Sequence, residues 1–167
     1  MKKLVQVVLA TILLSTLFVG GSVSTASAKE PKILEFDTMV GVPVGLTGTA
    51  SQGPLRGING GGAPWVIGSA KGELSVSGHL EIEVQGLVLA TTGSNPAAVF
   101  RARVSCVTST GGFENILTDA FPATTGPATS GGGNAKIETD VSLPQPCIAP
   151  IIFVTNNGGS WFAATGF

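Results

Sequence analysis

Strict alternation of apolar and polar residues along short stretches is the feature of this chain that most limits its fold. In residues 79–85 the apolar positions are Leu80, Ile82 and Val84. A period of two places these side chains on one face of a β-strand and the polar side chains on the other. The same alternation recurs in residues 73–77, 98–108 and 135–143. No long stretch shows a helical period, so we expect an all-β protein.

Turn-forming residues separate these stretches about every 8 to 15 positions, as they do in β-sandwiches and barrels. Further strands are expected at residues 33–42, 65–70, 113–118, 148–155 and 160–165. Because one face of each alternating strand is apolar, two antiparallel sheets can bury those faces against each other. The prediction is a single-domain antiparallel β-sandwich of roughly 7–9 strands.

Local signals refine this prediction. Gly78 lies between two alternating runs and indicates a tight hairpin, whereas the change of apolar parity after Gly86 indicates a β-bulge. The continuously apolar run Ile151–Val154 indicates a central strand covered on both faces. Glycine-rich loops are expected at residues 57–64 and 126–134, and a hairpin turn is expected at residues 156–159.

The first 28 residues have the pattern of a secretory signal peptide. Lys2 and Lys3 precede a mostly apolar segment, residues 4–19, and Ala26-Ser27-Ala28 has the small residues of a cleavage site. We expect residues 29–167 to form a secreted domain of bacterial type, either extracellular, at the cell surface, or periplasmic if the source has an outer membrane. The chain has no later long apolar run, so no stable membrane insertion is expected after cleavage. An uncleaved anchor is the alternative.

Cys106 and Cys147 are the only cysteines, and export would place them where disulfides persist. We predict that they form one intrachain disulfide. Two separate buried thiols, or an intermolecular bridge, are the alternatives. Two cysteines and one histidine supply too few ligands at a recognisable spacing for a zinc site, so no metal site is expected.

Charged residues are scarce, at 11% of the chain, and the formal net charge is −1. Without Lys2 and Lys3 the chain keeps seven basic and ten acidic side chains, a net charge of −3. Such a chain lacks the basic footprint of a nucleic-acid-binding protein. The glycine stretch at residues 57–62 lacks the Gly-Lys-Ser/Thr of a phosphate-binding loop, so no nucleotide cofactor is expected.

His79 is the only histidine, so any histidine-dependent mechanism must use it. By strand parity it faces outward beside Glu81 and Glu83, where the three side chains could hold a metal ion weakly or form an acid–base pair. A solvated polar face is the favoured interpretation. The chain has no Gly-x-Ser-x-Gly motif for a serine nucleophile.

Glycoside hydrolysis requires two carboxyl groups roughly 5–9.5 Å apart. Glu81 and Glu83 meet that distance but point outward from a regular strand. Glu114 and Asp119 flank another expected strand and could border a groove with Asp37. No feature of the sequence singles out any of these acids, so no catalytic residue is assigned.

Trp65 and Trp161 each follow a glycine-rich segment and form a candidate binding surface for a glycan or a protein ligand. Packing of the two indoles in the core at the ends of the sandwich is the favoured interpretation.

Arg101 and Arg103 lie on the polar face of one expected strand. Ion pairs with Glu81 and Glu83 on a neighbouring strand are the favoured interpretation, and anion binding is the alternative.

These observations favour a secreted, non-catalytic β-sandwich protein with a surface, binding or structural role and an unknown ligand. The first alternative is an extracellular hydrolase that uses His79 and nearby acids. The second alternative is a self-assembling surface or pilus-like subunit.

Overall fold

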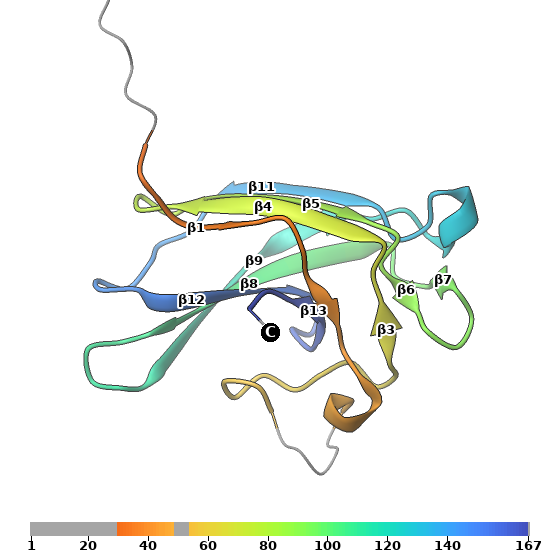
Figure 1. Ribbon diagram of the computed structural model, residues 1–167, viewed down its shortest axis with the longest axis horizontal. Coiled ribbons are helices and arrows are strands. Elements are labelled where there is room, and N and C mark those ends of the chain that lie inside the picture. The colour runs from red at the N-terminus through yellow and green to blue at the C-terminus, as the bar shows by residue number, and fades with distance from the viewer. Residues whose placement is uncertain (1–29, 49–53, 167) are drawn as a thin grey trace, which may run out of the picture.

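The computed structural model describes residues 30–48 and 54–166, so the expected signal peptide lies outside the described residues. The chain is all-β and every strand pairing is antiparallel, as predicted. Its two larger sheets lie one above the other (Figure 1). Among the described residues, no helix is long and apolar enough to cross a membrane.

The four-stranded sheet has the order β1-β4-β5-β11 and the five-stranded sheet the order β2-β13-β12-β8-β9. The first contains β1 (Lys32–Phe36), β4 (Ser69–Ser75), β5 (His79–Gln85) and β11 (Ala135–Asp140). The second contains β2 (Val40–Gly41), β13 (Trp161–Ala164), β12 (Ile148–Thr155), β8 (Val99–Val107) and β9 (Phe113–Pro122). Two short ribbons pair β3 (Trp65–Val66) with β6 (Val88–Leu89) and β7 (Ser94–Asn95) with β10 (Gly126–Pro127). The 3-10 turns η1 (Val44–Leu46) and η2 (Ala128–Ser130) complete the described elements.

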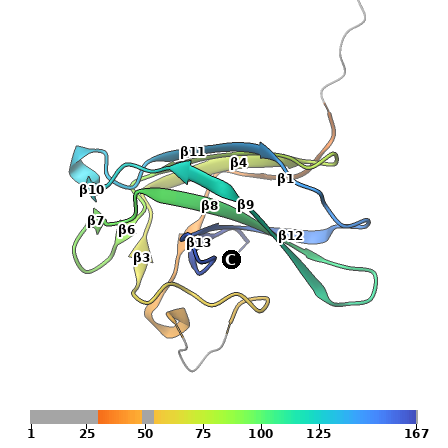
Figure 2. The same cartoon turned by 180° about the vertical axis from the view of Figure 1, so that it is seen from behind.

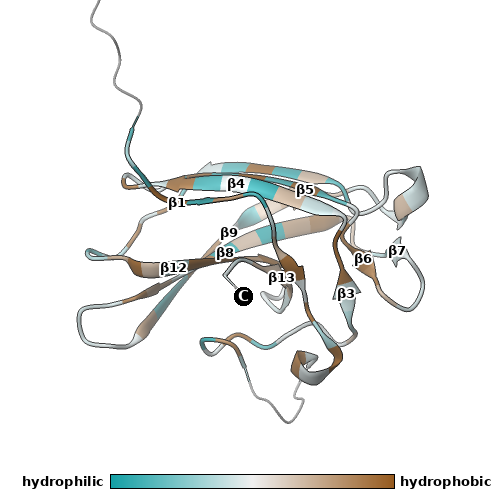
Figure 3. Cartoon of the chain, viewed as in Figure 1, coloured by the Kyte–Doolittle hydropathy of each residue, from teal (hydrophilic) through white to brown (hydrophobic). Residues whose placement is uncertain are grey.

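The core lies between the two larger sheets and follows the predicted alternation. Leu80, Ile82 and Val84 of β5 are buried, and so are the alternate residues of β8 from Phe100 to Cys106. Figure 3 shows hydrophobic and hydrophilic residues alternating along β4, β5 and β8. The alternation of apolar and polar residues in the sequence therefore indicates which face of each strand packs inward.

The second half of β12, from Ile152 to Thr155, is covered on both faces, as the unbroken apolar run predicted. Ile152 and Val154 face the four-stranded sheet, and Phe153 between them is also fully buried. On the second face lies the segment 54–62, which Figure 1 shows beneath β13. Its backbone bonds directly to β13, because the nitrogen of Trp161 donates to the oxygen of Asn59 at 3.0 Å, and the nitrogen of Gly61 donates to the oxygen of Trp161 at 2.7 Å.

Three local predictions need correction. The expected strand 33–42 is split, because the chain leaves the four-stranded sheet after Phe36 and enters the other as β2. The expected strand 65–70 is likewise split between β3 and β4. The parity change at Gly86 marks the end of β5 rather than a bulge within a strand: Gly86 has a φ of +66°, and the residues beyond it form β6, which pairs with β3.

The hairpin at Gly78 is confirmed, with β4 and β5 paired on either side. Gly78 has a φ of +99°, and a Cβ there would lie 1.9 Å from the carbonyl oxygen of Val141. Only glycine fits this turn, because any side chain would meet the backbone that follows β11.

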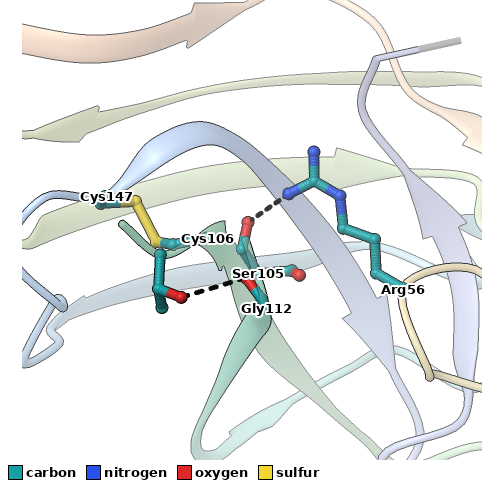
Figure 4. Close-up of a disulfide and its surroundings, with 6 residues drawn as sticks. Arg56, Ser105, Cys106, Gly112 and Cys147 are labelled. Atoms are coloured by element: carbon teal, nitrogen blue, oxygen red, sulfur yellow. Dashed lines mark hydrogen bonds between the residues drawn. A yellow bond between two sulfur atoms is a disulfide. The ribbon is translucent and has the colours of Figure 1, made fainter. Parts of the chain in front are cut away.

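The disulfide between Cys106 and Cys147 is present, as predicted, and closes a sequence separation of 41 residues. It joins the end of β8 to the residue immediately before β12 (Figure 4). Because β8 and β12 are neighbours in one sheet, the bridge ties two strands of that sheet together rather than the two sheets of the sandwich.

Candidate functional site

All three arginines of the chain lie over one face of the five-stranded sheet. Arg101 and Arg103 lie on the face of β8 that points away from the core, since the residues that alternate with them are buried: Phe100, Ala102 and Val104. Arg56 comes from the covering segment, and its Nη1 donates a hydrogen bond to the carbonyl oxygen of Ser105 at 3.0 Å (Figure 4). Alternate residues of a strand are about 6.6–7 Å apart, so Arg56 continues the line of Arg101 and Arg103. We call these three residues the arginine row.

Neutral groups hold the arginine row in place. Arg101 donates from Nε to the carbonyl oxygen of Thr118 at 2.7 Å and from Nη1 to that of Asn157 at 3.2 Å. The guanidinium of Arg56 lies 5.4 Å from the centre of the Phe113 ring, a cation–π contact. These contacts orient the side chains but leave their positive charges uncompensated.

Among residues 30–48 and 54–166, no carboxylate pairs with the row. None of the ion pairs among the described residues includes an arginine. Apart from Glu114 and Asp119 on β9, every acidic residue lies on or beside the four-stranded sheet. The fold therefore separates its arginines from most of its carboxylates.

Burial makes this arrangement costly for Arg103. Its pKa is lowered by burial and lowered further by the positive charge of Arg101. Its buried Nε has no hydrogen-bond partner among the described residues. Burial also lowers the pKa of Arg56. An anion beside the row would oppose these effects, because it favours the charged forms and supplies acceptors to the guanidinium groups.

The turn after β12 borders the row. A Cβ added at Gly159 would lie 2.1 Å from Nη2 of Arg103, so the turn packs closely against this guanidinium. Beyond the other end of the row, Phe113, Val107 and Ile148 pair across the three strands β9, β8 and β12. Phe113 and Ile148 are about half exposed, at 55% and 47%. The row is thus flanked by a polar turn on one side and an apolar patch on the other.

The ion pairs expected between this strand and Glu81 or Glu83 do not form. The two glutamates lie on β5, in the other sheet, whereas Arg101 and Arg103 lie on β8. Glu83 pairs instead with Lys71 at 2.8 Å, and Glu81 with Lys136 at 3.3 Å. Alternation alone predicted two polar faces but did not show that they belong to different sheets.

The outer face of the four-stranded sheet carries acidic residues with interspersed lysines. It has a shallow hollow of about 750 Å³, whose charged lining is Glu35, Asp37, Lys71, Glu73, Glu81 and Glu83. No group of histidine, cysteine or carboxylate residues suited to a metal ion occurs within 30–48 and 54–166. The groove considered for Asp37 with Glu114 and Asp119 is not formed, because β1 and β9 are edge strands of different sheets.

His79 has a carboxylate partner that strand parity did not reveal. Its Nδ1 is 2.9 Å from Oδ1 of Asp140, which lies opposite it on β11. The hydrogen bond with Asp140 raises the pKa of His79. Both side chains are exposed, at 43% and 84%, and His79 does not line the hollow described above. This pair meets one requirement of a hydrolase, an oriented imidazole, on an open surface.

The two tryptophans are buried rather than displayed. Trp65 is 5% exposed and stacks on Phe162 with ring centres 3.9 Å apart. Trp161 is fully buried and meets Phe153 edge-to-face at 5.9 Å. Core packing, the interpretation favoured from the sequence, accounts for both, and neither ring presents a face to a glycan or protein ligand.

Arg56 is the member of the row that sequence reasoning missed. It lies in the segment Pro54-Leu55-Arg56-Gly57, which has no alternation, and it reaches Ser105 across 49 residues. Local pattern carries no information on such a contact. The signal that was available is compositional, since the chain has only three arginines and two of them share one strand face.

Comparison of the chain with family models, with curated proteins and with solved structures finds no match.

Proposed function

We propose that this is a secreted, non-catalytic β-sandwich protein that binds an anionic ligand along the arginine row. The observation that carries the proposal is the placement of Arg56, Arg101 and Arg103 over one face with no carboxylate partner among the described residues. Like charges repel, so such a cluster costs stability unless an anion neutralises it. The row is therefore best suited to binding an anion.

Sulfate or carboxylate groups repeated along an extended polymer suit this row. Guanidinium groups present paired donors that match the oxygens of such groups. Arg101 and Arg103 lie on β8 and Arg56 bonds to Ser105 of the same strand, so the row favours a linear ligand lying along β8 over a single compact anion. Anionic extracellular glycans belong to this chemical class.

The export pattern of the sequence supports the extracellular part of the proposal. The leader pattern of residues 1–28 is of the secretory type, and a disulfide between Cys106 and Cys147 is of the kind that persists in oxidising compartments. Both features suit a domain that acts outside the cytoplasm.

Self-assembly is the other non-catalytic candidate. It would use the unpaired edge of β9 to pair with another chain. Within the described part of the chain, this strand of ten residues pairs with β8 alone, apart from the bridge that joins Ala123, just after it, to Ala135 (Figure 2). Asp119, Pro122 and a register shift opposite Arg101–Arg103 interrupt that edge, however. Charges, proline and bulges are devices that keep edges from pairing, so the edge supports self-assembly less than the arginine row supports binding.

The proposal is tested by measuring binding of the mature protein to immobilised dextran sulfate, with neutral dextran as the control. Retention on the sulfated polymer alone, weakening as salt increases, is the expected result, because salt screens exposed charges. Equal retention on dextran sulfate and on neutral dextran would overturn the proposal. Activity against ester or glycoside substrates that is lost in His79→Ala would instead support the hydrolase.

A further inference from the structure

We infer that Asn157 is a site of spontaneous deamidation, and that its conversion to a carboxylate weakens anion binding at the arginine row. The second half of this inference rests on the proposed function. Asn157 and Gly158 form the exposed tip of the turn between β12 and β13. An asparagine followed by glycine is the least hindered sequence for this reaction, because glycine has no Cβ to block attack by its own backbone nitrogen.

Hydrogen bonds hold the residues on either side of the tip, whereas the reacting groups of Asn157 and Gly158 make none within the described part of the chain. Asn156 receives a hydrogen bond from the nitrogen of Ser160 on Oδ1 at 3.0 Å, and its carbonyl oxygen receives another from the nitrogen of Gly159 at 3.0 Å. Among the described residues, neither the side-chain amide of Asn157 nor the backbone nitrogen of Gly158 makes a hydrogen bond. The two reacting groups are therefore accessible and uncommitted.

The reaction needs only water. The backbone nitrogen of Gly158 attacks the side-chain carbonyl carbon of Asn157, and a new C–N bond closes a five-membered succinimide. The bond between that carbon and the amide nitrogen of Asn157 breaks, and the amide leaves as ammonia with the proton from the Gly158 nitrogen. Water then opens the ring at either carbonyl and gives aspartate or isoaspartate, each with one new carboxylate.

In the other Asn-Gly pair of the chain, Asn59-Gly60, the glycine is tightly packed instead of exposed at the tip of a turn. Gly60 is buried, and a Cβ there would lie 2.0 Å from the carbonyl oxygen of Leu46. The carbonyl oxygen of Asn59 receives a hydrogen bond from the nitrogen of Trp161. Ring closure needs the backbone to rotate, and this packing opposes rotation. The same dipeptide is thus reactive in one place and protected in the other.

A carboxylate at position 157 would arise beside two arginines. The carbonyl oxygen of Asn157 already accepts a hydrogen bond from Nη1 of Arg101, and Gly159 of the same turn contacts Arg103. The new negative charge would neutralise part of the row from within the chain. Exposed charge pairs have modest energies, so the expected loss of affinity for the ligand is about two- to fivefold.

The reaction is measured by incubating the folded, disulfide-bonded protein in mildly alkaline buffer and then mapping tryptic peptides by mass spectrometry after reduction. The two pairs fall in separate peptides, residues 57–71 and 137–167. The expected result is a time-dependent exchange of amide for carboxylate in 137–167 alone. Gly158→Ala is the matched variant, because a Cβ there meets only Oδ1 of Asn156, at 3.4 Å, and it should slow the reaction severalfold.

Equal conversion of both peptides, or no slowing in Gly158→Ala, would overturn the assignment of the site. The effect on binding is tested separately with Asn157→Asp on immobilised dextran sulfate, with Asn157→Ser as its uncharged control. Weaker retention of Asn157→Asp alone is expected. If both variants bind as the wild type does, the regulatory half is wrong and anion binding stands. If the wild type itself does not bind, the proposed function fails while the peptide result remains valid.

Discussion

Gly159 packs directly on Arg103: a Cβ at this glycine would lie 2.1 Å from Nη2 of the guanidinium. The turn residue has a φ of +87°, a conformation that only glycine adopts readily. This contact fixes the position of the β12–β13 turn over β8. The backbone of this turn thus forms one side of the arginine row.

Gly159→Ala should therefore destabilise the fold by about 1–3 kcal/mol, chiefly because alanine is strained at this φ, with a smaller part from displacing the end of the Arg103 side chain. The free energy of unfolding in urea measures this effect. The double variant Gly159→Ala with Arg103→Ala should recover part of the loss, because the clash disappears while the strain remains. Wild-type stability of the single variant would show that the turn can move away from Arg103.

Loss of the disulfide should lower stability more. Replacing Cys106 and Cys147 together by alanine frees a loop of 41 residues in the unfolded chain. In the chain-entropy model such a loop corresponds to about 4 kcal/mol. The variant should still fold with the same β-sheet circular dichroism spectrum at low temperature but unfold at a lower urea concentration. An unchanged urea midpoint would contradict this account.

The pair of His79 and Asp140 should add a small dependence of stability on pH. The hydrogen bond with Asp140 raises the pKa of His79 in the folded chain above the ordinary value of 6.5. Protonated His79 therefore stabilises the folded chain. Its contribution is fully present below that ordinary value and is lost as pH rises through the folded-state pKa.

Because both side chains are exposed, we expect a difference of roughly a few tenths of a kcal/mol. Comparing the unfolding free energy of the wild type and His79→Gln between pH 5 and 8 checks it. The difference in unfolding free energy between the two proteins should become smaller as pH rises. A gap that widens would show that the pairing does not favour the charged imidazole.

Trp161 should be among the most sensitive core positions. It is fully buried, packs edge-to-face on Phe153 and carries the backbone bonds to the covering segment. Trp161→Ala should cost about 3–5 kcal/mol in unfolding free energy. Val66→Ala, at a valine 49% exposed, serves as the control and should change little. Similar losses in the two variants would argue against the covered face of β13.

Alternation and turn residues were sufficient to predict the all-β class and the inward residues of β5 and β8, and the two cysteines with the export pattern were sufficient to predict the disulfide. These features are local, or depend on a single pair of residues such as Cys106 and Cys147. The sheet to which each strand belongs was not predictable, because β5 and β8 show the same alternation. That long-range choice decides which charges meet, which is why the expected pairing of Arg101 with Glu81 was wrong.

The candidate site depends on the same choice. Arg56 joins the row only through folding of an irregular segment over the five-stranded sheet, and the carboxylate beside His79 comes from β11, 61 residues away. Neither partner has a local signal in the sequence. The separation of arginines from carboxylates is thus a property of the topology rather than of the composition.

The most direct test of anion binding is a comparison of two double variants on immobilised dextran sulfate. Arg101→Gln with Arg103→Gln removes charge from the row, whereas Lys71→Gln with Lys136→Gln removes the same charge from the opposite sheet. Urea unfolding should first establish that both variants are folded. Binding through the row predicts a loss of affinity of about tenfold or more in the arginine variant and little change in the lysine variant. Equal losses in the two variants would contradict the account, because binding would then follow net charge and not the row.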